Sequence, residues 1–433
     1  MLPKMIKREP AIGYRNFLIL LLVLRIISYF MLSDSLIVVQ ALKAGIRISL
    51  TLIITGTLFF RLRESDDKPV QFHQPTPLML YVLYLVFGAA SLLWTSSFKA
   101  SFLQWLMDVE SFVFAFLFIR LLLIYRRRFP GGYFDIHKIL APSVLIIATG
   151  FLIGLYTDPD HFYRLTHGGA VSRLGGFIIN PNELGMLLLI GITSFLPLLV
   201  KKKKVRISIL LSLVFLTYLL LMTGSRSSLI GMFLVMIIFG LTSGSNTQKI
   251  FIVSLAVALI PIGAVTIFVK QEQIAEIFTF TGRIPFWQDL LRYNFPKEPW
   301  LGYGYMRIDY ADKFESINAY SGAMTHNTFM QVLLGLGLAG LFLVLLQLSS
   351  FLWTMRQIAD RKYRLIISLL FIPIFINSMT EFGIFGETNY GILFYLFLVF
   401  TTSTEHLTGS RRIKATTGHE NLHGIPYRPA HLT

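Results

Sequence analysis

Three arginines and one histidine are the side chains through which this chain could do chemistry. Arg173, Arg226, Arg283 and His326 all lie in segments between long apolar runs. A guanidinium group binds phosphate oxygens through paired N–H donors, and a histidine can take a proton from a hydroxyl group near neutral pH. These residue types predict a site that binds an anion such as a lipid diphosphate and activates a hydroxyl group.

Two of the arginines lie beside expected helix starts. Arg226 occupies a tight turn in the segment MTGSRSS, where Ser227 or Ser228 can cap the next helix and leave its free N–H groups for an anion. Arg283 precedes Pro285, which suits the first turn of a helix. The competing interpretations are a snorkelling arginine for Arg226 and a carboxylate or headgroup partner for Arg283.

The histidine directly precedes a long apolar span and is therefore expected at the depth of the membrane surface. In the segment THNT, His326 is followed by Asn327 and Thr328, and either of these residues can cap the helix. This position suits a base that deprotonates an acceptor hydroxyl group. A structural histidine at a helix start is the alternative.

The first arginine opens a segment with the sequence RLGGFIINPNELG. The glycines after Arg173 permit a close approach of the backbone, and the sequence NPN predicts a turn with a helix N-cap. Asn180 or Asn182 could instead bind a sugar hydroxyl group or a phosphate oxygen. We therefore include both asparagines among the candidate substrate-binding residues.

Acidic residues raise the questions of a metal ion and of a proton pathway. Asp158 and Asp160 form a D-x-D pair that could hold a divalent cation, but the intervening proline favours a helix-terminating turn. Asp108, Glu110 and Glu381 lie in or near spans, and we interpret them as counterions for arginines rather than as a proton relay. No metal ligand and no cofactor are therefore expected.

The composition indicates a membrane protein. Of the 433 residues, 54% are hydrophobic and only 14% are charged, whereas soluble domains carry about 25% charged residues. The net charge of +16 is concentrated in short clusters between apolar runs, which is a topological pattern and not a nucleic-acid-binding surface. The chain has no cysteine, so disulfides and thiolate metal sites are excluded.

The apolar runs predict an all-α polytopic membrane protein with about 12 transmembrane helices, since a span needs about 20 apolar residues. Their expected centres lie near Leu24, Ile53, Val86, Phe114, Ile147, Leu189, Phe215, Val235, Val257, Leu341, Leu370 and Phe397. Every second loop is basic, which places both termini in the cytoplasm. The four basic side chains then share the outer face.

This topology divides the chain into a membrane domain and a tail. The transmembrane domain is expected over residues 1–406, and the outer loops at about 157–183 and 270–327 form its site, because long loops in compact proteins are usually functional. The polar residues 407–433 are expected to form a disordered cytoplasmic tail.

The second long outer loop has a helical pattern of its own. A short amphipathic helix in the membrane interface is predicted by apolar residues at helical spacing, namely Ile284, Trp287, Leu290 and Leu291. Asp289 and Arg292 lie between them on the expected polar side. Trp300, Tyr303 and Tyr305 follow as expected aromatic anchors.

Taken together, these segments resemble the O-antigen ligase and O-antigen polymerase superfamily of bacterial membrane glycosyltransferases. The matching segments, in the family order, are SRLGGFIINPNELG, TGSRSSLIG, GRIPFW leading to PWLGYGY, and THNTFMQVLLGLGLAGL. They cover residues of about 165–345. The first five spans agree with the family in topology only.

The resemblance implies a GT-C-like, inverting and metal-independent glycosyltransferase in the bacterial inner membrane with its site facing the periplasm. The donor would be a glycan on undecaprenyl diphosphate, and the acceptor would be a hydroxyl group of lipid A–core or of another glycan. Arg226 and Arg283 would bind the donor diphosphate, and His326 would be the base. Arg173, Asn180 and Asn182 would line or shape the site.

Three functions remain open at this stage. A ligase would transfer a finished glycan to lipid A–core, and a polymerase would extend a lipid-linked glycan with the same motifs. Protein oligosaccharyltransferases are close relatives of both. A transporter of lipid-linked sugars would show charges at the membrane midplane and broken helices in paired halves. The sequence shows neither pattern, so we expect an enzyme, with ligase as the first interpretation.

Overall fold

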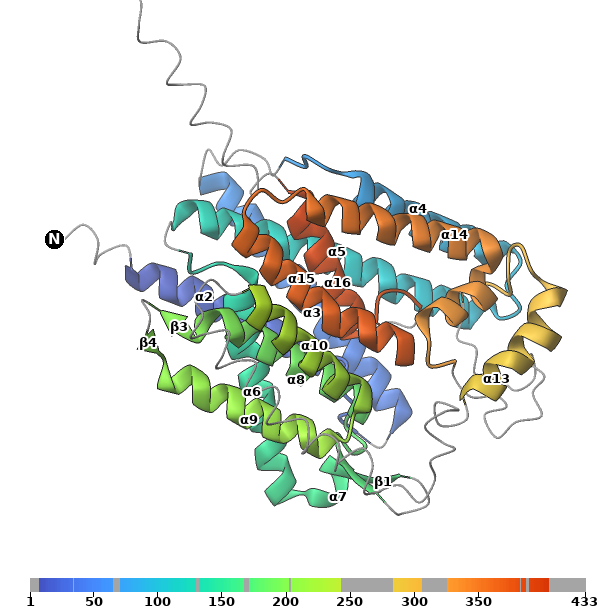
Figure 1. Ribbon diagram of the computed structural model, residues 1–433. Coiled ribbons are helices and arrows are strands. Elements are labelled where there is room, and N and C mark those ends of the chain that lie inside the picture. The colour runs from blue at the N-terminus through green and yellow to red at the C-terminus, as the bar shows by residue number, and fades with distance from the viewer. Residues whose placement is uncertain are drawn as a thin grey trace, which may run out of the picture.

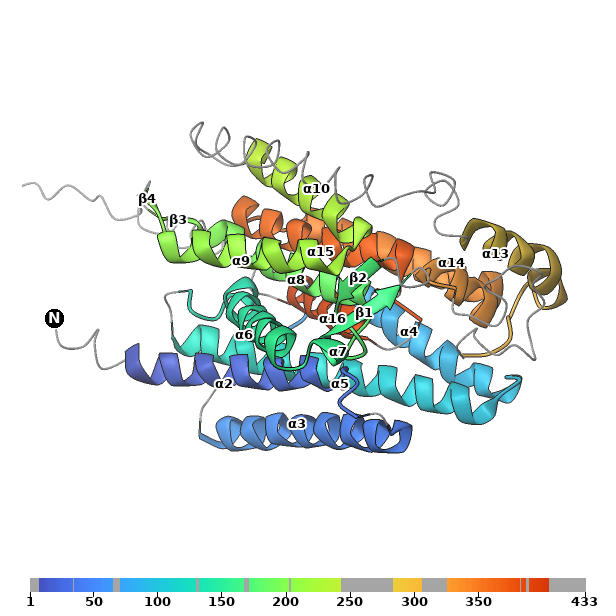
Figure 2. The same ribbon diagram turned by 90° about the horizontal axis from the view of Figure 1, so that it is seen from below.

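The computed structural model is a bundle of long helices (Figures 1 and 2). It describes residues 8–33, 35–64, 71–129, 132–166, 171–201, 204–242, 283–305, 325–381, 383–386 and 389–404. The main helices are α2 (Arg8–Ile27), α3 (Leu36–Glu64), α4 (Thr76–Ala90), α5 (Phe98–Arg128), α6 (Ile136–Thr157), α8 (Pro181–Phe195), α9 (Ile207–Thr223), α10 (Arg226–Thr242), α14 (Thr328–Arg356), α15 (Arg361–Thr380) and α16 (Tyr390–Ser403). Every residue of α16 is buried, so this helix forms the centre of the core.

The helices agree with a polytopic membrane protein. Among the described residues, seven segments are long and apolar enough to cross a membrane: Pro10–Ile27, Val38–Arg61, Thr76–Leu93, Ile136–Thr157, Pro181–Leu198, Thr328–Arg356 and Arg361–Thr380. The apolar helices α9, α10 and α16 are shorter, and α5 has 31 residues but carries more charge. The span expected near Val257 lies outside the described residues, so the count of about twelve stays a prediction. The proposed tail, 407–433, lies outside them as well.

Two short hairpins interrupt the helical pattern. Strands β1 (Tyr163–Thr166) and β2 (Val171–Leu174) pair in antiparallel fashion in the first long loop, after the single turn α7 (Pro159–Phe162). Strands β3 (Val200–Lys201) and β4 (Lys204–Val205) form a smaller hairpin. The sequence patterns predicted neither hairpin. The first one matters for function because β2 carries Arg173.

The helix ends gather into two opposite groups. At one end, Arg126 of α5 pairs with Asp135 (3.3 Å) and lies over the Tyr363 ring of α15. At this end as well, Phe72 before α4 is bridged to Thr404 after α16. Since neighbouring helices are antiparallel, the starts of α8, α10 and α14 and the end of α15 lie at the opposite end. All predicted site residues that the structure describes belong to this second group.

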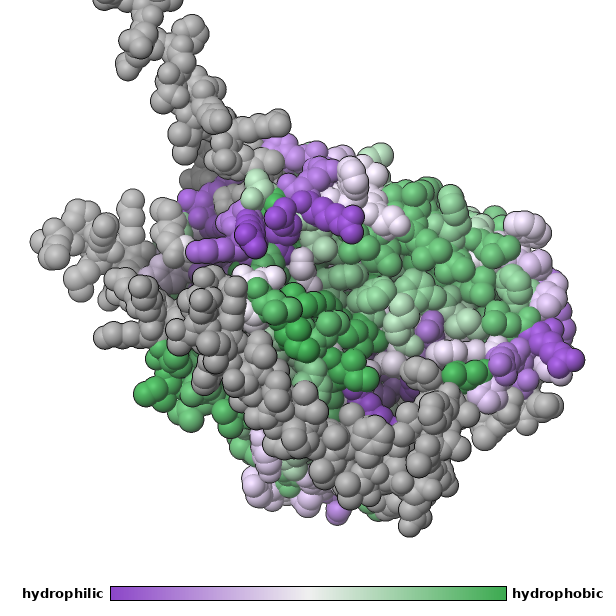
Figure 3. Space-filling view, viewed as in Figure 1, coloured by the Kyte–Doolittle hydropathy of each residue, from purple (hydrophilic) through white to green (hydrophobic). Residues whose placement is uncertain are grey.

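Exposed apolar side chains cover the surface between these ends. Figure 3 shows a hydrophobic surface over α10 and α14, with hydrophilic residues at the upper left and at the right. The exposed apolar residues of this surface are Ile230, Leu234, Ile237 and Leu241 on α10 and Leu338, Phe342, Leu345, Leu346 and Trp353 on α14. Such a surface suits contact with lipid tails.

Helix α14 is broken at Gly337, which has a positive φ of 65°. A Cβ atom at this position would lie 2.3 Å from the Trp300 carbonyl group, so only glycine fits. Residues 299–304 replace the hydrogen bonds that the break removes, through Tyr303 N to Leu334 O (3.0 Å), Gly304 N to Gly335 O (2.8 Å), Leu338 N to Pro299 O (2.9 Å) and Ala339 N to Trp300 O (3.2 Å). A break inside a membrane helix is stable when its backbone groups are satisfied in this way.

This break interrupts one helix and is not one of the paired breaks that we expect of a transporter. The glycines of GLGLAGL fit an apolar helical run, so the pattern concealed the break. Arg25 and Asp108 are buried in α2 and α5. The absence of charges at the membrane midplane stays a prediction.

The short helix of the second long loop exists, but it buries a different face from the predicted one. Helix α13 (Arg283–Asp289) continues through Leu290–Asn294 and Phe295–Lys297. Phe286 and Leu290 pack against Leu334 of α14, and Asp289 is buried as well, whereas Leu291 is exposed. The helix therefore rests on α14 through the side that holds Phe286.

The expected aromatic anchors of this loop behave differently from one another. Trp300 is exposed, as predicted, and Tyr303 is partly buried. Tyr305 is buried and donates a hydrogen bond to Asp108 of α5, so its expected role as an interfacial anchor was wrong. This contact ties the second long loop to α5.

Candidate active site

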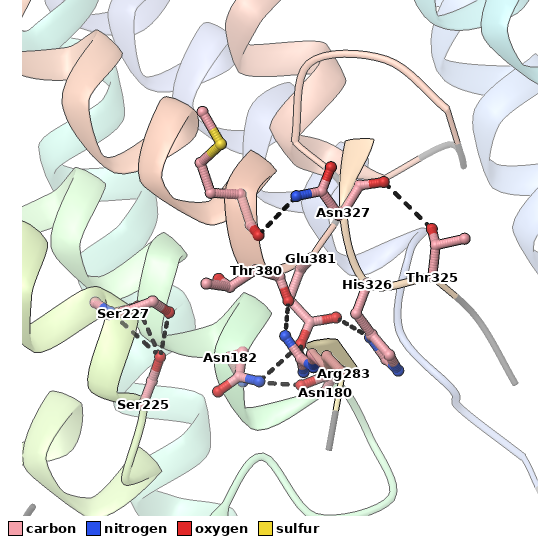
Figure 4. A network of polar contacts seen from close by, with 12 residues as sticks. Asn180, Asn182, Ser225, Ser227, Arg283, Thr325, His326, Asn327, Thr380 and Glu381 are labelled. Carbon is pink, nitrogen blue, oxygen red and sulfur yellow. Dashed lines mark hydrogen bonds and ion pairs between the residues drawn. The ribbon is translucent and has the colours of Figure 1, made fainter. Parts of the chain in front are cut away.

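One buried carboxylate, that of Glu381, joins three of the predicted site residues (Figure 4). Its Oε1 atom accepts hydrogen bonds from Asn182 Nδ2 (2.8 Å) and Arg283 Nη2 (3.0 Å). Its Oε2 atom lies 2.6 Å from His326 Nδ1. These contacts bring together the start of α8, the start of α13, the segment just before α14 that holds His326, and the end of α15.

Arg173 extends this network toward the turn between α9 and α10. Its Nη2 donates to Asn182 Oδ1 (2.6 Å), and its Nε donates to the Thr223 carbonyl oxygen (2.7 Å). Burial lowers the pKa of Arg173, Glu381 opposes this shift, and the cations of Arg226 and Arg283 add to it, so the pKa falls to about 10. Several positive charges therefore share a small volume.

Neighbouring side chains stabilise the negative charge of Glu381. Burial alone would raise the pKa of this carboxyl group, since a charged group loses solvation in the protein. The contact with His326, the Arg283 cation and the hydrogen bond from Asn182 outweigh that effect, and the pKa falls to about 2. Glu381 is therefore ionised throughout the physiological range.

Arg226 begins helix α10 beside Arg173. The α9 helix ends at Gly224, whose φ of 59° closes the helix and directs the chain into the turn. Ser225 Oγ accepts from the Ser228 N–H group (3.4 Å), so Ser225 caps α10 rather than the predicted Ser227 or Ser228. The turn packs against α8, because a Cβ atom at Gly185 would lie 2.7 Å from Ser225 Cβ.

The two predicted asparagine caps are confirmed. Asn180 Oδ1 accepts from the Asn182 N–H group (2.9 Å) at the start of α8. Asn327 Oδ1 accepts from the N–H groups of Phe329 (2.9 Å) and Met330 (3.0 Å) at the start of α14. The side-chain oxygens of Asn180 and Asn327 are thus used by helix ends, whereas Asn182 bridges Arg173 and Glu381.

His326 has an unusual backbone conformation for a residue with a side chain. Its φ is 49°, the one positive φ found on a non-glycine residue among the described part of the chain. This left-handed conformation costs about 1–2 kcal/mol, and such strain often occurs at functional sites. The imidazole ring is 21% exposed, and in Figure 4 its second nitrogen points away from Glu381.

Two residues of this cluster were not predicted as site residues. Glu381 was interpreted only as a counterion, and its pairing with Arg283 confirms that interpretation (3.0 Å). The available signal was a single carboxylate that ends an apolar helix on the same side as the basic loops. Arg164 lies directly opposite Arg173 in the β1–β2 hairpin. Like charges in this arrangement repel each other, which favours an anion near them.

The D-x-D pair has no metal-binding arrangement in this structure. The Asp158 carboxylate pairs with His161 (2.8 Å) near the start of α7, and this agrees with the helix-terminating turn. In the part of the chain that the structure describes, no group of three His, Asp or Glu side chains is arranged to hold a metal ion.

Comparison with known proteins supports the motif-based recognition. Residues 211–345 match the family model described as O-antigen ligase. The matched region includes Arg226, Arg283 and His326, whereas Arg173, the two asparagines and Glu381 lie outside it. A search of curated proteins finds no match to the chain. The match supports the resemblance to the O-antigen ligase superfamily over residues 211–345, which hold three of the four basic site residues.

Proposed function

We propose that this protein is an O-antigen ligase-type glycosyltransferase, which moves a glycan from undecaprenyl diphosphate to a hydroxyl group of lipid A–core. The observation that carries this proposal is the clustering of cations with one histidine at a single end of the helix bundle. Arg226 and Arg283 act electrostatically on Arg173, and Glu381 is paired with Arg283 and lies close enough to Arg173 to act on its charge. The excess of positive charge suits a diphosphate.

The arginines would act on the leaving group. When the bond between the sugar and the diphosphate breaks, negative charge develops on the diphosphate oxygens. Guanidinium groups that are already held in place can stabilise this charge, and each such donor is typically worth about 3–4 kcal/mol. In our proposal Arg226 and Arg283 contact the diphosphate. Arg173 orients the site through its hydrogen bonds to Asn182 and Thr223.

The histidine would act on the acceptor. The hydroxyl proton moves to His326 while the hydroxyl oxygen attacks the anomeric carbon from the face opposite the diphosphate. This single displacement inverts the configuration at that carbon. The arginines and His326 supply charge stabilisation and a base, so the proposed reaction needs no metal ion.

The asparagines have supporting roles in this proposal. Asn180 is engaged in capping α8, and Asn182 donates to Glu381 while it accepts from Arg173. These contacts support a role in shaping the site. A contact of either amide with a sugar hydroxyl group stays a prediction.

The proposed orientation follows from the charges at the two ends of the bundle. The basic clusters, such as residues 126–128 and 361–364, lie at the end opposite the candidate site. Basic loops are retained in the cytoplasm. We therefore propose that both termini face the cytoplasm and that the site faces the periplasm across the inner membrane.

Reconstitution tests the proposed reaction directly. The purified protein is placed in liposomes with a glycan on undecaprenyl diphosphate, in EDTA, with and without lipid A–core. Glycan attached to lipid A–core together with free undecaprenyl diphosphate is the result expected of a metal-independent ligase. Longer glycan that remains on undecaprenyl diphosphate without lipid A–core would instead identify a polymerase. Movement of the intact donor across the bilayer with no transfer would identify a transporter.

A further inference from the structure

We propose that Glu381 is a positioning residue, which orients His326 and determines which ring nitrogen receives the acceptor's proton. This inference rests on the proposed function, in which His326 is the base. It assigns a role to a carboxylate that lies outside the region matched by the family model.

The side chains of Glu381 and His326 are in direct contact, with Glu381 Oε2 2.6 Å from His326 Nδ1. An ionised carboxylate only accepts hydrogen bonds, so the neutral imidazole must carry its hydrogen on Nδ1. The lone pair is then on Nε2, which is the nitrogen directed away from Glu381 (Figure 4). The pairing therefore selects the tautomer that a general base needs.

The same contact stabilises the product of proton transfer. The acceptor O–H bond breaks and its proton binds His326 Nε2, while the oxygen's electron pair forms the new bond to the anomeric carbon. The bond from that carbon to the diphosphate oxygen breaks, and the diphosphate leaves with the bonding electrons. The imidazolium that results lies against the charged carboxylate of Glu381. A carboxylate has this role in the Ser-His-Asp triad, where it remains ionised.

Several hydrogen bonds fix the position of the Glu381 carboxylate. Its second oxygen accepts from Asn182 and Arg283, and Arg283 also donates to the Thr380 carbonyl oxygen. The backbone around it is fixed by Asn327 Nδ2, which donates to the Met379 carbonyl oxygen (3.1 Å). These contacts join the end of α15 to the starts of α8, α13 and α14, so the carboxylate cannot rotate away without breaking several hydrogen bonds.

The alternative role for Glu381 is to hold Arg283 for the donor. Both roles use the same carboxylate, but they predict different kinetics. Loss of a residue that positions the base lowers kcat alone, whereas loss of a residue that positions a donor-binding arginine raises the donor KM as well. Measurement of kcat and of the donor KM therefore distinguishes the two roles.

The test compares Glu381→Gln with Glu381→Asp in the liposome transfer assay. The Gln variant keeps the shape of the side chain but loses its charge, so either tautomer of His326 can form. We expect kcat to fall about 100-fold or more, within the range of general-base effects, with the donor KM changed by less than about threefold. Glu298→Gln, at an exposed glutamate on the α13 loop, is the matched control and should transfer as the wild type does.

The pH profile gives a second readout. Glu381, which follows α15, is in contact with His326 and with Arg283 of α13, and it acts electrostatically on Arg173 of β2. Replacement by Gln removes the negative charge that lies beside the His326 ring. The acidic limb of the kcat profile should therefore move to lower pH in Glu381→Gln and stay in place in Glu381→Asp.

Three outcomes decide the proposal. Wild-type kcat in Glu381→Gln, while His326→Ala is inactive, would overturn the positioning role and leave the proposed function intact. A donor KM raised well beyond threefold would overturn it in favour of the Arg283 role. If the Gln variant does not fold, the Asp variant decides, because its shorter carboxylate keeps the charge but cannot reach both partners. Its kcat should fall about tenfold, and wild-type kcat would again reject the proposal.

Discussion

The molecule contains two arginine–carboxylate clusters that look alike in sequence and differ in construction. In the inner cluster, Arg25 of α2 binds both oxygens of Glu110 on α5 (2.8 and 2.6 Å) and also donates to Ser111 (3.1 Å). The Arg25 side chain is fully buried and lies over the Phe114 ring. In the outer cluster, Glu381 shares its two oxygens among residues from three other elements.

The difference lies in the access to the cations. In the inner cluster Arg25 is fully buried and bound to both oxygens of Glu110, and the buried Arg47 lies close enough to act on the same groups. The outer cluster places several cations around Glu381 at the helix ends, where the Arg283 and His326 side chains are 16% and 21% exposed. A paired charge in a span contributes to the fold, whereas a surplus of reachable cations can bind a substrate.

The largest expected effect is on His326. Replacement by alanine removes the proposed base, so transfer should fall by about 10²–10⁴-fold at normal expression. The inner cluster is untouched, and the thermal stability of the purified protein in detergent should stay close to that of the wild type. Transfer at the wild-type rate would remove His326 from the mechanism.

The second-largest effect is expected from replacing an arginine by lysine, and it should differ between the two clusters. Arg226→Lys keeps the charge but loses the planar pair of donors, so transfer should fall by about 10²–10³-fold, as for loss of one fixed donor group. The matched change in the inner cluster, Arg25→Lys, should lower thermal stability and leave the transfer rate per folded molecule unchanged. Equal losses of transfer in both variants would contradict the distinction between the clusters.

A third change addresses the inner cluster alone. Glu110→Gln leaves the buried Arg25 without its counterion, and a broken buried ion pair typically costs about 3–5 kcal/mol of stability. The denaturation midpoint in detergent should fall clearly. The double variant Arg25→Met with Glu110→Leu should recover much of the loss, since both charges are then absent. A stable Glu110→Gln protein would show that the pair adds little to the fold.

The smallest effect concerns the pH dependence of stability through Glu381. The folded protein lowers the pKa of this group from 4.5 to about 2, so between these values the unfolded chain binds more protons than the folded one. The stabilisation is fully present above about pH 4.5 and is lost as the pH falls toward 2. Thermal unfolding between pH 2 and 7 should show this loss in the wild type, and Glu381→Gln should lack that part of the dependence.

Local sequence patterns could predict the helix starts and the basic loops. Asn180 and Asn327 cap their helices as expected, because capping depends only on the nearest backbone N–H groups. The apolar runs likewise mark most of the described helices. The family motifs contain Arg226, Arg283 and His326, which explains why these residues could be named without a structure.

Long-range pairing could not be predicted in the same way. His326 and Glu381 are 55 positions apart, and any outer arginine could have been the partner of that carboxylate. Tyr305 had the pattern of an interfacial aromatic residue, yet it is buried against Asp108 of α5. The break at Gly337 was concealed because a glycine in an apolar run is equally compatible with an intact helix and with an interrupted one.

The interrupted helix has a consequence for how the protein is made. Residues 299–304 supply both the donors and the acceptors that α14 lacks at its break, and they leave the ribosome before α14 does. Without this segment, α14 would carry unpaired backbone groups at its break, and such groups are costly in hydrocarbon. The helix depends on the loop for its own backbone, so we expect the two to settle in the bilayer as one unit.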